Sequence, residues 1–196
     1  PWVISRPASP KTSTPTVPVG GVDWMAGYIA RAKSQNSNSV VVSAGDLIGA
    51  SPLVSALFHD EPTIETMNRA GLEFNAVGNH EFDEGKNELL RMQNGGCHPI
   101  DGCQGPHPFL GAKFRYLAAS TFEKSSGKTV FPAYEIREFD GIPVAFIGLT
   151  LKGTPGLVSP AGVADLEFRD EAGTVNALIP ELKSRGVEAI VVLIHE

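Results

Sequence analysis

Two short stretches of the sequence place metal-binding and acid–base side chains directly after apolar runs. In VVVSAGDLIGASP the run leads to Asp46, and in AVGNHEFDEG it leads to Asn79, His80 and Asp83. A third apolar run, VEAIVVLIHE, leads to His195. Carboxylate, amide and imidazole groups are suitable ligands for a hard or borderline divalent ion, so these residues suggest metal-dependent chemistry.

The apolar runs are expected to be buried strands. Binding sites in open α/β sheets gather at the carboxyl ends of strands, so we expect Asp46, Asn79 and His195 to converge. The two oxygens of Asp46 could bridge two ions. His80 could serve as a general acid or phosphate binder, with Asp83 accepting its other N–H and fixing the ring. Each residue alone is more commonly a turn residue, a helix cap or core filler, so the hypothesis depends on all three strand ends meeting.

Apolar spacing and turn signals predict an alternation of helices and strands. The Asp140-Gly141 pair predicts a two-residue hairpin, Asp60 and Asp170 are expected to cap helices, and the continuous apolar run of the last strand predicts burial on both faces. Helices are expected within 22–35, 51–58, 60–71, 86–94 and 170–186, and strands within 40–44, 74–77, 114–120, 133–139, 142–150 and 187–196. The pattern predicts an α/β fold with a mixed sheet or two sheets.

Length, composition and charge limit the domain organisation and the classes of partner that the chain suits. The 196 residues suit one domain or a large part of one, and residues 1–21, rich in Pro, Ser and Thr, predict an extended arm before a domain at 22–196. The formal charge of −6, without a basic stripe, argues against a nucleic-acid duplex as partner. No apolar run approaches the roughly 20 residues of a membrane span.

The two cysteines lie six positions apart in GGCHPIDGCQG. A disulfide between Cys97 and Cys103 is favoured over free thiols or half of a zinc site. Such a disulfide would suit an exported protein. His98, in the same segment, and His107 are expected to be loop residues. His59 is expected to cap a helix end beside Asp60.

The segments GDLIGAS and GNHEFD resemble the second and third signature motifs of the calcineurin-like metallophosphoesterases. Together with TIETMNRAGLEFNAVGNHEFDEG and VVLIHE, they resemble the branch of 5'-nucleotidases and 2',3'-cyclic-nucleotide phosphodiesterases over residues 20–196. The resemblance implies an αββα sandwich with mixed parallel and antiparallel sheets. It also implies hydrolysis of phosphoesters, with nucleotides as the expected small-molecule substrates and nucleotide catabolism as the expected setting.

Roles follow from the resemblance for single residues. Asp46 matches the carboxylate that bridges two divalent ions, Asn79 and His195 match ligands of one of these ions, His80 matches the catalytic histidine, and Asp83 matches the acid that orients it. Zn, Mn, Co, Fe and Mg all suit such ligands, so the sequence does not identify the metal. The family and the cysteine pair imply a periplasmic or extracellular location, and the oligomeric state stays open.

The sequence departs from the family pattern at two motifs. Its 196 residues contain neither an Asp-x-His nor a Gly-His-x-His motif. We therefore expect a part of the catalytic domain that lacks the first strand and the C-terminal part, binds at most one ion weakly and is inactive or nearly so. Two alternatives remain open: a thiosulfohydrolase-type relative on the same scaffold, and a non-catalytic truncated binding protein.

Overall fold

The computed structural model describes residues 20–195, so residues 1–19 of the expected arm lie outside the described range. Internal contacts divide the chain into one unit at 1–39 and a larger one at 40–196. In the first unit, helix α1 (Val22–Gln35) has the predicted bounds. None of the described helices combines the length and the apolar character that crossing a membrane requires. The domain boundary at residue 22 stays a prediction.

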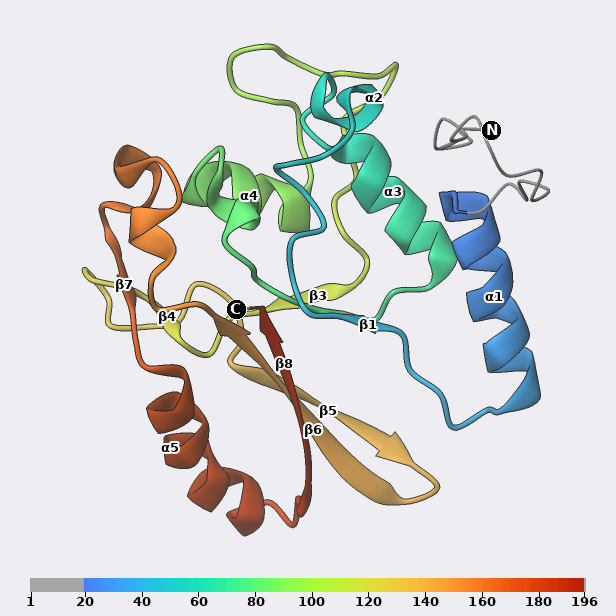
Figure 1. Cartoon of the computed structure of the whole chain (residues 1–196), viewed down its shortest axis with the longest axis vertical. Coiled ribbons are helices and arrows are strands. Elements are labelled where there is room, and N and C mark those ends of the chain that lie inside the picture. Colours follow the sequence, from blue (N-terminus) through green and yellow to red (C-terminus); the bar gives the residue numbers. More distant parts are fainter. Residues whose placement is uncertain (1–19, 196) are drawn as a thin grey trace, which may run out of the picture. The chain divides into compact units, whose positions relative to one another are not determined.

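Two three-stranded sheets form the centre of the larger unit (Figure 1). One sheet is parallel, in the order β1-β2-β3, and the other has the order β5-β6-β8, with β6 antiparallel to β5 and parallel to β8. Their bounds are β1 (Val42–Ser43), β2 (Phe74–Ala76), β3 (Arg115–Leu117), β5 (Tyr134–Phe139), β6 (Ile142–Thr150) and β8 (Ala189–His195).

Apolar side chains join these sheets and the helices outside them into four layers. Phe74 and Ala76 of β2 pack in one cluster with Phe146 of β6 and Leu193 of β8, which holds the two sheets face to face. Helices α3 (Glu61–Ala70) and α4 (Lys86–Asn94) join a second cluster through Ile64, Leu89 and Met92, together with Tyr116 of β3. Helix α5 (Glu171–Ser184) packs Leu182 with Ala145 and Ile147 of β6. The predicted αββα sandwich with mixed sheets is confirmed.

Local sequence signals explain several of these elements. Asp140 and Gly141 both have positive φ, 47° and 82°, as the predicted two-residue hairpin between β5 and β6 requires. Asp170 accepts a hydrogen bond of 2.7 Å from the Gly173 N–H and caps α5 as expected. The predicted disulfide between Cys97 and Cys103 is present.

Two expectations were wrong or incomplete, and one small sheet was not predicted. Among the described residues β8 pairs only with β6, and Val191, Val192 and Ile194 are 37–41% exposed, so the strand is not buried on both faces. Asp60 stands at the start of α3 with φ 58° and does not cap it, because its carboxylate binds the Gly49 N–H and the Ser51 hydroxyl. The two-stranded antiparallel sheet of β4 (Thr121–Glu123) and β7 (Leu166–Phe168) was not predicted from the sequence.

The remaining described elements are helix α2 (Leu53–Ala56) and the 3-10 turns η1 (His80–Phe82), η2 (Thr154–Gly156) and η3 (Pro160–Val163).

Candidate metal and catalytic site

The ends of β1, β2 and β8 meet around Gly45. This residue has φ +104°, and a Cβ on it would lie 2.7 Å from the Gly78 nitrogen and 3.1 Å from the His195 Cβ. Asp46 follows with φ 54°, a left-handed conformation that Asp tolerates better than most residues. Only glycine fits at position 45, because the backbone after β1 runs against both neighbouring strand ends.

The Asp46 carboxylate lies at the point where the three strand ends come together. Its Oδ2 is 2.7 Å from His195 Nε2, and its Oδ1 accepts a hydrogen bond of 3.0 Å from the His80 N–H. A Cβ on Gly78 would lie 2.2 Å from the same Oδ1, so the carboxylate occupies the space that a side chain there would need. Asp46 and His195 are therefore in direct contact.

Asn79 lies between Gly78 and His80, both of which adjoin Asp46. Its backbone is helical, its carbonyl accepts the Phe82 N–H, and its side chain does not cap the η1 turn that follows. The structure thus places all three predicted ligand residues at one end of the sandwich. A carboxylate, an imidazole and an amide form a donor set that fits a divalent cation.

His80 is held by Asp83, as the sequence predicted. The His80 Nδ1 is 2.7 Å from Asp83 Oδ2, and this hydrogen bond outweighs partial burial and raises the pKa of His80 above its ordinary value. Glycine at position 49 allows the backbone of His80 to lie close to this loop, because a Cβ on Gly49 would lie 2.4 Å from the His80 carbonyl oxygen. The protonated imidazole is favoured, which suits binding of an anionic group.

Glu81 is the site residue whose role the sequence did not reveal. It is 2% exposed, and its carboxylate accepts the N–H groups of Asp46, Leu47 and Gly78 at 2.8, 2.9 and 2.8 Å. Burial raises the pKa of Glu81 to about 7, while these N–H groups favour the ionised form. One side chain therefore ties the loop after β1 to the loop after β2.

Asn75 supports the same arrangement from the middle of β2. It is fully buried, accepts the Gly45 N–H at 3.2 Å and lies with its amide nitrogen 3.4 Å from Glu81 Oε1. The available signal was a polar residue inside the apolar run FNAV, since a buried amide requires partners.

Comparisons with known proteins agree with the fold and the motifs. No family model matches the chain. It is 46% identical over 176 residues to Endonuclease YhcR of Bacillus subtilis, covering 90% of this chain and 14% of that protein. It is 30% identical over 154 residues to the 5'-nucleotidase of Vibrio vulnificus, covering 79% of this chain and 25% of the relative. The chain thus spans a minor part of both relatives.

Solved structures show the same architecture. The NAD nucleotidase of Haemophilus influenzae superposes with a TM-score of 0.74 at 27% identity, over 91% of this chain and 29% of that one. The calcineurin-like phosphoesterase YfkN of Bacillus subtilis gives a TM-score of 0.68 at 24% identity, over 87% of this chain and 52% of that one. The fold is that of the calcineurin-like phosphoesterases, and the chain is similar to 5'-nucleotidases over a part of their length.

Proposed function

We propose that the protein to which this chain belongs hydrolyses phosphoesters of nucleotides with the help of two divalent metal ions. The observation that supports this most directly is the meeting of three strand ends at the Asp46 carboxylate, with His195 at 2.7 Å and the His80 N–H at 3.0 Å. In this proposal Asp46 bridges the two ions, while Asn79 and His195 hold one of them. The ions would supply an activated water and positive charge toward the phosphate.

The protein's own contribution is the placement of His80. Asp83 accepts the Nδ1 hydrogen, which leaves Nε2 to face the substrate in a fixed orientation. A protonated His80 would offset negative charge that develops on the phosphoryl oxygens in the transition state. For the 196-residue chain, three protein ligands should hold one cation weakly, and we expect little or no turnover.

A second candidate substrate is the phosphodiester bond of a nucleic acid. It is favoured by the 46% identity to a relative named as an endonuclease, and disfavoured by the formal charge of −6. The likeness to the thiohydrolase SoxB of Thermus thermophilus, at 19% identity, concerns the fold alone.

Substrate and metal dependence can be tested together. The 196-residue chain and its longer parent are assayed with a nucleoside 5'-monophosphate, a 2',3'-cyclic nucleotide, a single-stranded oligonucleotide and a chromogenic phosphodiester, before and after chelation and re-addition of Mn²⁺ or Zn²⁺. We expect hydrolysis of the mononucleotides by the parent, loss on chelation and recovery with metal. A parent that binds metal but hydrolyses none of the four would refute the proposal.

Replacing Asp83 by Asn tests the role of His80 separately. The amide can still contact the ring, but it no longer favours the protonated imidazole, and we expect kcat of the parent to fall roughly 10–100-fold with metal content unchanged. Glu65→Gln, on the exposed face of α3, is the matched control and should leave kcat unchanged. An unchanged pH profile and kcat in the Asp83 variant would show that the pair is merely structural.

The disulfide supports a location in an oxidising compartment, either the periplasm or the exterior of the cell. Mass spectrometry after alkylation of protein from its native source would test this. Free thiols at Cys97 and Cys103 would contradict it.

A further inference from the structure

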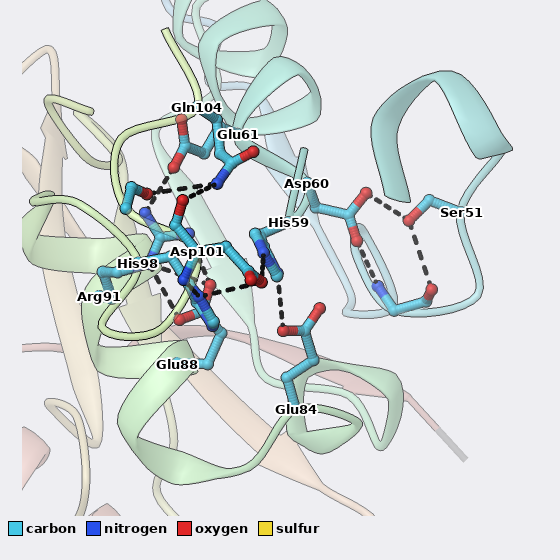
Figure 2. Close-up of polar contacts among 12 residues, drawn as sticks. Ser51, His59, Asp60, Glu61, Glu84, Glu88, Arg91, His98, Asp101 and Gln104 are labelled. Carbon is cyan, nitrogen blue, oxygen red and sulfur yellow. Dashed lines mark hydrogen bonds and ion pairs between the residues drawn. The ribbon is translucent and has the colours of Figure 1, made fainter. Parts of the chain in front are cut away.

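A second cluster of ligand-type side chains lies beside α4 and the disulfide loop, the segment from Cys97 to Cys103 (Figure 2). His59 Nδ1 is 3.0 Å from Glu84 Oε2, and His59 Nε2 is 3.0 Å from Asp101 Oδ2. The expectation that His59 caps a helix is therefore wrong. His98 lies in the loop as expected, but its ring stacks on that of His59 with centroids 3.8 Å apart and planes within 9°.

The disulfide loop and α4 build this cluster. The loop returns on itself through paired backbone hydrogen bonds of 3.0 Å between His98 and Gly102, which turns His98 and Asp101 toward His59. Arg91 fixes Glu88 through three hydrogen bonds of 2.6–3.0 Å and also donates to the Gly96 carbonyl at 2.8 Å. One donor atom from each of His59, Glu84, Glu88 and His98 lies within 4.8 Å of the other three.

The cluster has a net negative charge that a bound cation would offset. The cluster and the residues bonded to it contain four carboxylates and one guanidinium. Glu61 and Glu88 pair with Arg91, whereas Glu84 and Asp101 pair with His59. With both imidazoles neutral these groups have a net charge of −3, and with one imidazole protonated the net charge is −2. Protonating both histidines would place two imidazolium rings face to face at 3.8 Å, where they repel each other. A divalent ion would provide positive charge without that repulsion.

We propose that His59, Glu84, Glu88 and His98 form a binding site for Zn²⁺ or a similar borderline divalent cation, separate from the site at Asp46. Two imidazoles and two carboxylates make a four-ligand set that Zn²⁺ accepts in tetrahedral geometry. Zn–N and Zn–O bonds of about 2.0–2.2 Å put neighbouring donors about 3.3 Å apart, so the donors close inward and the stacked rings open as the ion binds. Glu88 keeps free lone pairs beside its bonds to Arg91.

The position of this site suggests a structural role. His59, Glu84 and Glu88 line the same small cavity as His80 and Asp83. Glu84 also directly follows Asp83 in the chain, while His98 belongs to the disulfide loop. A metal ion bound by both Glu84 and His98 would link the disulfide loop to the backbone next to Asp83, the residue that holds His80. Glu84 is 47% exposed, so the ion has a path from solvent.

Zinc titration of chelator-treated 196-residue chain tests the proposal without any activity measurement. The background carries Asp46→Asn, which weakens the other candidate site. We expect one equivalent of Zn²⁺ by calorimetry or by competition with a chromogenic chelator. His59→Gln or His98→Gln should weaken this binding by at least about 100-fold, since loss of an outer-shell partner alone costs 10–100-fold. His107→Gln, an exposed loop histidine, is the matched control and should bind as the background does.

Folding of each variant is checked by circular dichroism. If either histidine variant fails to fold, the half-exposed Glu84→Gln replaces it and should still weaken Zn²⁺ binding at least tenfold. Co²⁺ in the Asp46→Asn background should give the visible absorption of a four-coordinate ion. Absence of the Zn²⁺ equivalent, or its full retention in folded His59, His98 and Glu84 variants, would overturn the proposal. Since no substrate is used, failure of the phosphoesterase hypothesis would leave this result standing, and the reverse also holds.

Discussion

Replacing Asp46 by Asn should lower kcat/KM of the metal-loaded parent by at least about 1000-fold, because the amide provides neither the charge nor the second anionic oxygen that two ions require. Folding should persist. Asn tolerates the left-handed φ of 54° as well as Asp does, and its carbonyl oxygen can still accept the His80 N–H. We therefore expect a change in the free energy of unfolding within about 0.5 kcal/mol, accompanied by loss of the metal ions bound at the Asp46 site.

The hairpin offers a matched control for this experiment. Asp140→Asn makes the same change at another residue with positive φ, 47°. Asp140 lies on the exposed turn between β5 and β6, away from the ends of β1, β2 and β8 that form the site. It should keep full activity and full metal content. If Asp46→Asn retained turnover and as much metal as the unchanged parent, Asp46 would not be the bridging ligand. Activity is measured in the longer parent, and metal content by plasma mass spectrometry after dialysis.

Most of the fold could be predicted from the sequence, because the local helix, strand and turn signals agree with the elements that pack in the folded chain. The helices at Val22–Gln35 and Lys86–Asn94 have their predicted bounds, since polar or glycine residues end each apolar pattern. The Asp-Gly pair fixed the hairpin. The strands β4 and β7 were missed because each spans three residues, contains a glutamate and lies outside the continuous apolar runs from which the other strands were predicted.

The exposure of β8 shows where local patterns fail. A continuous apolar run predicts burial on both faces, but burial depends on which segments cover the strand. Among the described residues β8 is an edge strand, and Val191, Val192 and Ile194 are only partly covered. The sequence of β8 contains no information on that arrangement.

The candidate site divides in the same way. Asp46, Asn79 and His195 could be predicted because each follows an apolar run, and strand ends of α/β sheets meet. The clusters around Glu81 and His59 depend on contacts between residues 30 or more positions apart, such as Glu81 with Asp46 and His59 with Asp101. No spacing rule along the chain connects such residues, so only the folded arrangement shows them together.

Glu81→Gln should be among the most destabilising single changes in the chain, lowering the free energy of unfolding by about 3 kcal/mol. The Oε2 atom of Glu81 accepts the N–H groups of Asp46 and Gly78, and Oε1 accepts that of Leu47. An amide NH₂ placed at either oxygen position points a donor at a donor. At least one backbone N–H that is buried or partly buried then loses its acceptor, which costs about 1–3 kcal/mol beyond the lost charge-assisted bond.

The same change also separates a stability effect from a ligand effect. Glu81 touches the backbone of Asp46 and not its carboxylate, so Glu81→Gln should lower the melting temperature by roughly 6–12 °C and weaken metal binding only as the loop after β1 loosens. Glu138→Gln, on the exposed side of β5, should change the free energy of unfolding by less than about 0.5 kcal/mol. Urea denaturation of both variants decides the matter. Equal midpoints for Glu81→Gln and Glu138→Gln would mean that the two loops after β1 and β2 are held together by packing at Gly45 and Gly78, and that the buried carboxylate is dispensable for the fold.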